Sequence, residues 1–427
     1  MYILHFFMPK ILQITIDGNT GSTGRIAEAI GRLAMAHGWE SYIAHGRYAR
    51  PSESAIIQIG SYSDVLWHGF QTRVFDRHGL GSKKATIELV KKIEDFKPDV
   101  IQLHNIHGYY INMEVLFNYL SKTAIPVVWT FHDCWSITGH CAHFEFADCN
   151  KWKTECSKCH QKKEYPASYF IDRSKKNFHL KKRLFNSVQN MVVITPSNWL
   201  RNIVMESFMK EIPILTIPNG IDTTIFKPQS NSIEIKSKYH IGNRYMVLGV
   251  ASPWSQKKGL SDFIELNKLL KEDEVIVLVG LSSSQLKNLP ANIIGLAKTE
   301  NRQELIDIYS AADLFINPTW EDNFPTTNLE ALACGTPIAT YHTGGSIEAV
   351  SPDTGFIVEK GDIQALVEII KKLKESVKQQ YAEACRKRAV ELYSKDDRFK
   401  EYLDLYENLI RNQADKIKNN ETNISLN

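Results

Sequence analysis

The stretch Lys10-Ile-Leu-Gln-Ile-Thr-Ile-Asp-Gly-Asn-Thr-Gly-Ser-Thr-Gly24 establishes the fold class. Its first seven residues are mostly apolar and β-branched, which is typical of a buried strand. A loop with three glycines follows, and residues 25–37 then place apolar side chains at helical spacing. Strand, glycine-rich loop and helix in this order open a βαβ unit. The sequence therefore predicts an α/β fold with a parallel sheet.

The same alternation continues on both sides of a polar stretch near the middle of the chain. Strands are expected at 100–103, 127–131, 192–195, 245–251, 275–279 and 314–316. Helices are expected at 260–270, 305–311 and 327–334. The segment Ile217-Pro-Asn-Gly-Ile-Asp222 and the polar residues 227–237 predict a linker. We therefore expect two Rossmann-like domains, over 9–226 and 240–393, facing across a cleft at the carboxyl ends of their strands.

Composition is that of a soluble globular protein. The 427 residues suit two domains, and 43% are hydrophobic while 23% are charged. A net charge of +3 gives no general attraction to nucleic acid or to a membrane. No stretch approaches the roughly 18 consecutive apolar residues of a membrane span. The first residues lack the basic region of a signal peptide, so we expect a cytoplasmic protein.

The segment Asn317-Pro-Thr-Trp-Glu-Asp-Asn-Phe-Pro-Thr-Thr-Asn-Leu-Glu-Ala-Leu-Ala-Cys-Gly-Thr-Pro337 carries the most specific chemistry. A helix beginning near Thr327 has free backbone N–H groups at its start, which can receive a diphosphate. The carboxylate of Glu330, about one turn later, can accept two hydrogen bonds from a ribose diol. Asp322 lies eight residues earlier and is expected on the preceding loop.

This segment resembles the acidic signature of retaining glycosyltransferases of family 4, which have the GT-B fold of two Rossmann-like domains. The resemblance extends to Trp129-Thr-Phe-His-Asp133, to Ile217–Asp222 and to Lys257-Lys-Gly259, and so covers nearly the whole chain. It is similar in particular to bacterial transferases of colanic-acid and capsule polysaccharide clusters that also carry a cysteine-rich insert.

The resemblance implies a retaining glycosyltransferase of hexosyltransferase type, acting in bacterial surface polysaccharide synthesis. Its donor would be a UDP- or GDP-sugar, and its acceptor a glycan or a diphospholipid-linked sugar. The alternatives are a catalytically silent sugar-nucleotide-binding subunit and a GT-B sugar-nucleotide epimerase. The resemblance also implies that an amphipathic helix over 394–411 packs back on the N-terminal domain. We expect the polar residues 412–427 to form a flexible tail.

Four residues are expected in the catalytic machinery by this resemblance: His132, Lys258, Asp322 and Glu330. Asp322 stands where the family usually has glutamate, and Glu321 is adjacent, so either carboxylate is a candidate to face the donor sugar. Further donor contacts are expected from the start of the following helix, at Asn323, Phe324, Pro325, Thr326 and Thr327.

Lys258 resembles the family lysine that neutralises the departing diphosphate, and a fixed cation at that place lowers the barrier. An arginine that many relatives carry five or six residues earlier is absent, since Ser252 and Pro253 occupy that neighbourhood, and Lys257 is a candidate to compensate. The alternative for this lysine pair is a solvated turn.

Two features of the first domain are candidates for ligand contact. Gly21 and Gly24 permit close backbone approach to phosphate or sugar, or else form a plain tight turn. His132 ends a strand and, by the resemblance, touches the donor sugar or orients the acceptor, with Asp133 expected to hold its ring. His104 and His107 end another strand and are candidates to flank the acceptor.

A cysteine-rich insert is expected over 134–160. Cys141, Cys149, Cys156 and Cys159 have the composition of a structural zinc site, and disulfides and buried free thiols are the alternatives. Substitute ligands would be His140, His143 and His160, while Cys134 would be a bystander. Four thiolates leave no open coordination position, so such a site is expected to do no catalytic work. The resemblance to GT-B transferases implies that the leaving group is stabilised without a divalent metal, so no cofactor is expected in catalysis.

Residues Arg173–Arg183 carry six lysines and arginines. This run is a candidate for peripheral contact with anionic lipid headgroups at the inner face of the cytoplasmic membrane, or with a diphosphate-linked lipid acceptor. The alternative is a solvated helix face. Nucleic-acid binding is not expected, because no reader motif accompanies the run.

Overall fold

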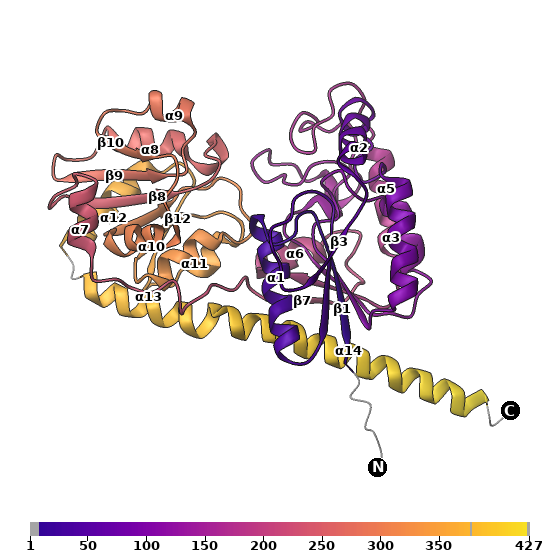
Figure 1. The fold of residues 1–427 in the computed structure, drawn as a ribbon. Coiled ribbons are helices and arrows are strands. Elements are labelled where there is room, and N and C mark those ends of the chain that lie inside the picture. The colour runs from indigo at the N-terminus through magenta and orange to yellow at the C-terminus, as the bar shows by residue number, and fades with distance from the viewer. Residues whose placement is uncertain (1–7, 376–377, 425–427) are drawn as a thin grey trace, which may run out of the picture. The chain divides into compact units, whose positions relative to one another are not determined.

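The structure is a computed structural model that describes residues 8–375 and 378–424 (Figure 1). The chain divides into two compact units. The first ends at Ile217 and takes up the chain again from Phe399, and the second spans Pro218–Arg398. The predicted linker over 227–237 is partly wrong, because Ser232–Lys238 form helix α7 of the second unit. Ile235 of α7 is buried in that unit's core, an anchor that its polar neighbours hid in the sequence.

The first unit is built on a sheet of seven parallel strands in the order β3-β2-β1-β4-β5-β6-β7. The strands are β1 (Lys10–Thr15), β2 (Glu40–His45), β3 (Ala55–Gln58), β4 (Val100–Leu103), β5 (Val127–Thr130), β6 (Met191–Thr195) and β7 (Ile214–Thr216). The order reverses direction between β1 and β4, and loops at the carboxyl ends of these two strands form the binding edge of such a sheet.

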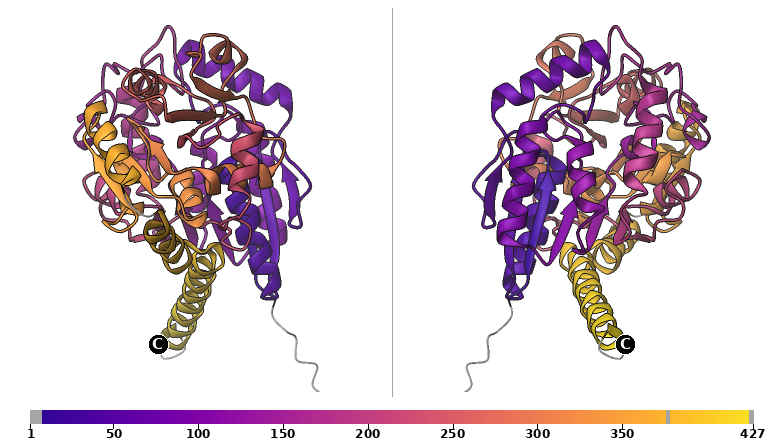
Figure 2. Two further views of the ribbon diagram at one scale, coloured as in Figure 1. Left: turned by 90° about the vertical axis from the view of Figure 1, so that its left-hand side faces the viewer. Right: turned by 90° about the vertical axis from the view of Figure 1, so that its right-hand side faces the viewer.

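Helices cover both faces of this sheet (Figure 2). They are α1 (Gly21–Ala36), α2 (Tyr62–Phe75), α3 (Lys83–Phe96), α4 (Met113–Leu120), α5 (Ser174–Phe185) and α6 (Asn198–Met205). Between β5 and α5 the chain is irregular except for the 3-10 turns η1 (Trp135–Ile137) and η2 (Lys151–Lys153). This irregular stretch holds the cysteine-rich segment.

The last helix, α14 (Lys395–Ile424), joins the first unit from Phe399 onward. Its aromatic side chains Tyr402 and Tyr406 are buried in one cluster with aliphatic side chains of α1 and of the central strands. The buried Tyr406 hydroxyl donates to Gln102 Oε1 at 2.9 Å, which satisfies two polar groups inside the core. Of the predicted flexible tail, residues 412–424 continue α14 through a segment without glycine or proline, and residues 425–427 lie outside the described residues. The flexibility of this segment stays a prediction.

The second unit repeats this plan with six parallel strands in the order β10-β9-β8-β11-β12-β13. They are β8 (Tyr245–Val250), β9 (Glu274–Val279), β10 (Ile293–Leu296), β11 (Leu314–Asn317), β12 (Ile338–Tyr341) and β13 (Gly355–Val358). β9 is buried at every position, as expected for a strand covered on both faces.

Two layers of helices enclose this second sheet. α10 (Arg302–Ala311), α11 (Thr326–Ala333) and α13 (Lys378–Tyr393) share one core cluster, whereas α8 (Leu260–Asn267) and α12 (Ile363–Lys374) share the other. Shorter elements are η3 (Gln256–Lys258), α9 (Ser283–Lys287) and η4 (Gly344–Ala349). No helix in the described residues combines the length and apolar composition needed to cross a bilayer.

Candidate functional site

The candidate site of the second unit lies at the carboxyl ends of β8 and β11, where the strand order reverses. The loop after β8 ends in η3 and carries the two lysines, and the loop after β11 carries the two acidic residues. Trp320 N donates to Lys257 O at 2.8 Å, so the two loops are joined through their backbones. Gly259 has φ +74°, and a Cβ there would come within 2.3 Å of Pro318 O. The close approach of the loops therefore requires glycine.

The two lysines pair with the two acids one to one. Lys257 Nζ lies 3.1 Å from Glu321 Oε1, and Lys258 Nζ lies 2.5 Å from Asp322 Oδ2. The Glu321 side chain is only 5% exposed, whereas those of Asp322 and Lys258 are 19% and 35% exposed. The Lys257 side chain is 28% exposed, so the two pairs differ in their acids: Asp322 is the one that a ligand can reach more readily, and Glu321 is buried.

Glu330 is held by a buried tyrosine of the neighbouring helix. The Tyr309 hydroxyl on α10 donates to Glu330 Oε2 at 2.9 Å. Burial, reinforced by this carboxylate, raises the pKa of Tyr309 well above its ordinary range, so the hydroxyl stays protonated and remains a donor. Tyr309 could not be recognised as a site residue from the sequence, because its partner lies 21 residues away on another helix.

The start of α11 has the form that an anion-binding terminus needs. Pro325 occupies the N-cap position and provides no side-chain cap, which leaves the first backbone N–H groups for other acceptors. Thr326 and Thr327 are partly exposed there, whereas Asn323 and Phe324 are buried. Phe324 packs on the ring of Tyr393 at 5.8 Å, so this predicted donor-binding residue has a core contact.

The proline–asparagine–glycine motif after β7 also reaches this turn. Asn219 Nδ2 donates to Phe324 O at 3.3 Å and thereby fastens the motif beside the helix start.

A buried polar network that the sequence did not reveal organises the same edge of the sheet. Asn328 Oδ1 accepts from Asn317 Nδ2 at 2.8 Å, and Asn328 Nδ2 donates to Ser346 Oγ at 3.0 Å. Ser346 Oγ in turn lies 2.7 Å from Thr340 Oγ1. These bonds fix η4 against α11. Thr343 precedes η4, and its buried Oγ1 has no hydrogen-bond partner among the described residues, which makes it a candidate for a ligand contact.

The first unit brings two histidines together at the ends of β4 and β5. His104 Nδ1 lies 3.1 Å from His132 Nε2, and His104 Nε2 lies 3.2 Å from Gln13 Oε1 on β1. Burial lowers the pKa of His132 to about 4 and that of His104 well below its ordinary value. Both rings are therefore neutral near pH 7, suited to hydrogen bonding with a sugar hydroxyl rather than to carrying charge.

The carboxylate of Asp133 bonds to His107 and to the backbone, and its expected role in holding the His132 ring stays a prediction. Its Oδ2 lies 2.6 Å from His107 Nε2, and its Oδ1 accepts from Trp135 N at 2.8 Å. Burial opposes the charge of Asp133, but the contacts with His107 outweigh it and lower the pKa to about 2. The other nitrogen of His107 lies 2.9 Å from the Tyr165 hydroxyl.

Comparison with known proteins identifies the family. The model of the family described as Glycosyltransferase Family 4 matches residues 23–225, and that of Glycosyl transferases group 1 matches residues 231–391. The chain belongs to glycosyltransferase family 4. The colanic acid biosynthesis glycosyl transferase WcaC of Escherichia coli K12 is 23% identical to this transferase over 432 residues, which cover 94% of this chain and all of WcaC.

Solved structures confirm the GT-B fold. A glycosyltransferase from Rickettsia africae superimposes with a TM-score of 0.68 at 17% identity, covering 95% of this transferase and 99% of that chain. Anabaena HepE in complex with UDP superimposes with a TM-score of 0.66 at 14% identity, covering 94% of this transferase and all of HepE.

The two glycines predicted to contact a ligand in the first loop of the transferase have different structural roles. Gly21 begins α1 with φ +65°, which favours glycine. A Cβ on Gly24 would lie 2.5 Å from Asp17 O, so Gly24 is needed for the packing of α1 on the loop. Contact of either glycine with a ligand stays a prediction.

The cysteine-rich segment of the transferase has no disulfide, since all seven cysteines are free. A hydrogen bond between Cys141 and Cys159 raises the pKa of Cys141 and lowers that of Cys159 to about 7. Cys149 and Cys156 lie near enough to raise the pKa of Cys141 further. In the described part of the chain, however, no three His, Cys, Asp or Glu side chains are placed to hold a metal ion. A zinc site would require these thiols to draw closer together.

The basic run 173–183 of the transferase is not a uniform surface. Lys181 is fully buried, and its Nζ donates to Trp135 O at 2.6 Å and to Thr138 O at 3.1 Å. The same Nζ lies 3.4 Å from the centroid of the Trp135 ring, a cation–π contact. Burial lowers the pKa of Lys181 to about 7. This lysine therefore organises the segment after β5 and does not face a membrane.

Proposed function

We propose that this transferase is a retaining enzyme that transfers a sugar from a UDP- or GDP-sugar in bacterial surface polysaccharide synthesis. The acceptor is a glycan or a diphospholipid-linked sugar. The accessible Lys258–Asp322 pair at the switch point of the second sheet carries the proposal, because it supplies the cation that a departing diphosphate needs. The relatives agree in class: one, 27% identical over 229 residues, is an Escherichia coli UDP-Gal:alpha-D-GlcNAc-diphosphoundecaprenol alpha-1,3-galactosyltransferase.

Each group at this edge has a role in the donor complex. The carboxylate of Glu330, positioned by Tyr309, accepts hydrogen bonds from the ribose diol. The uncapped N–H groups of α11 and the hydroxyl of Thr343 receive the diphosphate. Lys258 exchanges Asp322 for a diphosphate oxygen, and Asp322 is then released to accept from hydroxyls of the sugar.

In the transfer step the bond between the anomeric carbon and the diphosphate oxygen breaks as the bond to the acceptor oxygen forms. The acceptor's proton leaves with the nucleoside diphosphate, whose growing negative charge Lys258 and the α11 amides stabilise. This arrangement provides leaving-group stabilisation from the chain's own groups, and we propose that no metal or other cofactor takes part in catalysis. His132, neutral near pH 7, orients the acceptor by hydrogen bonding.

Binding of nucleotides tests the donor site. Thermal melts with UDP, GDP and ADP should show stabilisation by one of them, since a ligand that binds only the folded state raises the melting temperature. The Lys258→Met variant should lose most of that shift, while Lys371→Met, on the exposed surface of α12, should keep it. Failure of all nucleotides to stabilise the wild-type protein would contradict the proposed donor site.

A further inference from the structure

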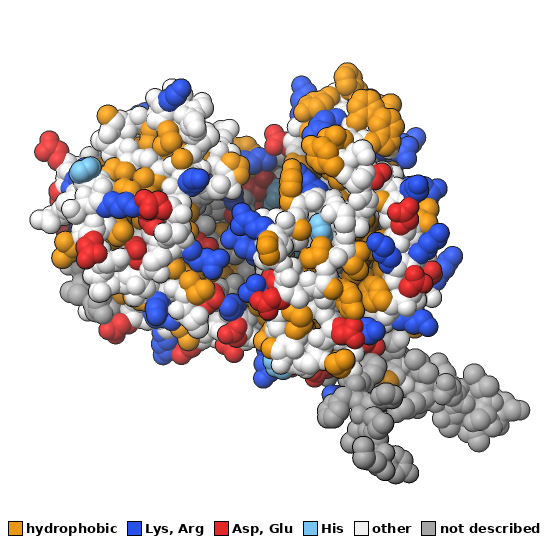
Figure 3. Space-filling view, in the orientation of Figure 1, with side chains coloured by type: hydrophobic (Ala, Val, Ile, Leu, Met, Phe, Trp, Pro, Cys, Tyr) orange, Lys and Arg blue, Asp and Glu red, His pale blue; other side chains and the backbone are white. Residues whose placement is uncertain are grey.

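The outer surface of α2 in the first unit is apolar and exposed. Together with the loop 165–171 it forms what we call the aromatic face, made of Tyr62, Leu66, Trp67, Phe70, Phe75, Tyr165, Tyr169, Phe170 and Ile171, each at least 41% exposed. The rings of Trp67 and Phe70 stack at 5.3 Å, and Phe70 meets Phe75 at 6.4 Å. Figure 3 shows hydrophobic side chains gathered over this part of the unit.

α2 reverses the usual pattern of a surface helix, which buries apolar side chains and exposes polar ones. It buries His68 and Thr72 completely, while Trp67 is 59% and Phe70 48% exposed. His68 is satisfied inside, since its Nε2 accepts from Gly79 N and Gly81 N at 3.1 and 3.2 Å, and its Nδ1 lies 3.0 Å from Ser82 Oγ. The helix is therefore held by these polar contacts together with Val65 in the core, and its other apolar side chains are left for a partner.

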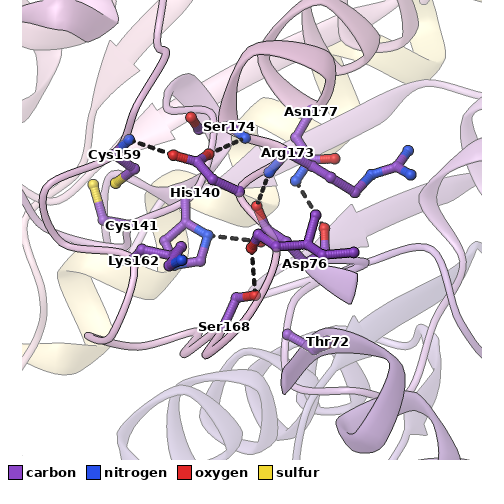
Figure 4. A network of polar contacts seen from close by, with 12 residues as sticks. Thr72, Asp76, His140, Cys141, Cys159, Lys162, Ser168, Arg173, Ser174 and Asn177 are labelled. Carbon is purple, nitrogen blue, oxygen red and sulfur yellow. Dashed lines mark hydrogen bonds and ion pairs between the residues drawn. The ribbon is translucent and has the colours of Figure 1, made fainter. Parts of the chain in front are cut away.

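The backbone under the aromatic face is fixed (Figure 4). Asp76 is the C-cap of α2. Its Oδ1 lies 2.7 Å from His140 Nδ1, and its Oδ2 accepts a hydrogen bond from Arg173 N at 2.7 Å. Tyr169 N donates to Arg73 O at 2.8 Å. The bond of Tyr169 holds the loop 165–171 against the last turn of α2, and the Asp76 contacts fix the end of that helix. The rings are thus presented on a preorganised surface, which lowers the entropy lost on docking.

Positive charge borders the aromatic face. Arg47 and Arg73 line a cavity of about 170 Å³, whose wall also includes Tyr62 and Leu66 of the face. Two further exposed cations flank these segments in the sequence: Arg77 follows α2, and Lys163 precedes the loop 165–171. Aromatic rings next to arginine and lysine are the composition of proteins at the lipid headgroup level.

We propose that the aromatic face docks on a bilayer of anionic phospholipids. The rings enter the boundary between headgroups and acyl chains, and Arg47 and Arg73 bind lipid phosphates. This goes beyond the proposed transfer reaction and places membrane contact on α2 and the loop 165–171 rather than on the run 173–183.

Trp67 permits a direct test, because it is the one exposed tryptophan among the eight, all of which lie in the described part of the chain. Vesicles of brominated phosphatidylglycerol should quench its fluorescence, and the protein should sediment with such vesicles. The double variant Trp67→Ser/Phe70→Ser should bind at least about tenfold more weakly. Arg47→Gln/Arg73→Gln should reduce the preference for phosphatidylglycerol over phosphatidylcholine. Ile233→Ser/Leu269→Ser, exposed apolar positions of the second unit, should bind as wild type.

Melting temperatures without lipid check that the variants fold, and nucleotide binding measured in parallel reports on the donor site separately. The proposal is overturned if wild-type protein stays in the supernatant, if the quenching is absent, or if the aromatic variant binds vesicles as wild type does. It is also overturned if sedimentation shows a dimer that the aromatic variant dissociates, since the face would then be covered by a second copy.

Discussion

Tyr309 positions the Glu330 carboxylate through a hydrogen bond, whereas Glu330 itself is expected to bind the nucleotide. Substitutions of the two residues should therefore affect stability and nucleotide affinity differently. Tyr309→Phe removes a buried donor to a carboxylate, a bond worth about 1.5–3 kcal/mol. Because Glu330 is only partly buried, water replaces some of this bond. We expect a loss of about 1–2 kcal/mol in the free energy of unfolding and a modest weakening of donor binding.

Glu330→Gln should show the opposite balance. The amide oxygen still accepts from Tyr309, so the free energy of unfolding should change by less than about 1 kcal/mol. The ribose diol, however, loses a charged acceptor, and a difference of about 1.5–3 kcal/mol corresponds to roughly 10- to 100-fold weaker binding of the nucleotide. Urea unfolding and isothermal titration measure the two quantities. Glu368→Gln, on the exposed side of α12, is the matched control and should change neither.

Unaltered nucleotide affinity in Glu330→Gln would refute the ribose assignment. A loss of affinity in Tyr309→Phe as large as in Glu330→Gln would also count against the reasoning, since the tyrosine would then do more than hold the carboxylate.

Three further predictions concern charge, pH and metal. Lys258→Met should lower turnover about 100-fold or more, because the leaving diphosphate loses its cation. Lys257→Met should affect mainly the free energy of unfolding. Equal turnover in Lys258→Met and the wild type would refute the leaving-group role. The pKa of His68 is lowered to about 4, chiefly by burial, so the unfolded chain binds this proton first as the pH falls. Neutral His68 therefore contributes fully to the free energy of unfolding above pH 6.5, and this contribution, about 3 kcal/mol in total, is lost between pH 6.5 and 4. Urea unfolding of His68→Gln should lack this part of the pH dependence. A pH profile identical to that of the wild type would contradict the assignment. Elemental analysis should find close to one zinc per chain, released when Cys159→Ser is introduced; metal-free protein with four reactive thiols would end the zinc proposal.

The parallel strands and the acidic motif were readable in the sequence because they depend on local patterns. Val100–Leu103 is a strand at the predicted residues, and α11 begins within one residue of its predicted start. Hydrophobic periodicity did not predict α7, because this short helix buries a single apolar residue, Ile235. It also failed at the end of α14, where helix continues without an apolar stripe.

Pairing of side chains from distant segments was not readable. The sequence left Glu321 and Asp322 as candidates, and only the loop geometry distinguishes the buried Glu321, paired with Lys257, from the more exposed Asp322, paired with Lys258. The partners of Asp133 and Lys181 were hidden for the same reason, because each depends on the turn η1. The aromatic face of α2 was missed because its buried side is polar, which removes the usual amphipathic signal.

Acceptor-dependent release of nucleoside diphosphate is the measurement that tests the central claim most directly. The protein would be incubated with labelled UDP- and GDP-sugars, with and without a pool of diphospholipid-linked and glycan acceptors, and the product linkage read by NMR. We predict release of UDP or GDP that rises with the acceptor and a product that keeps the anomeric configuration of the donor. Donor binding without acceptor-dependent release, or a product of inverted configuration, would contradict the account.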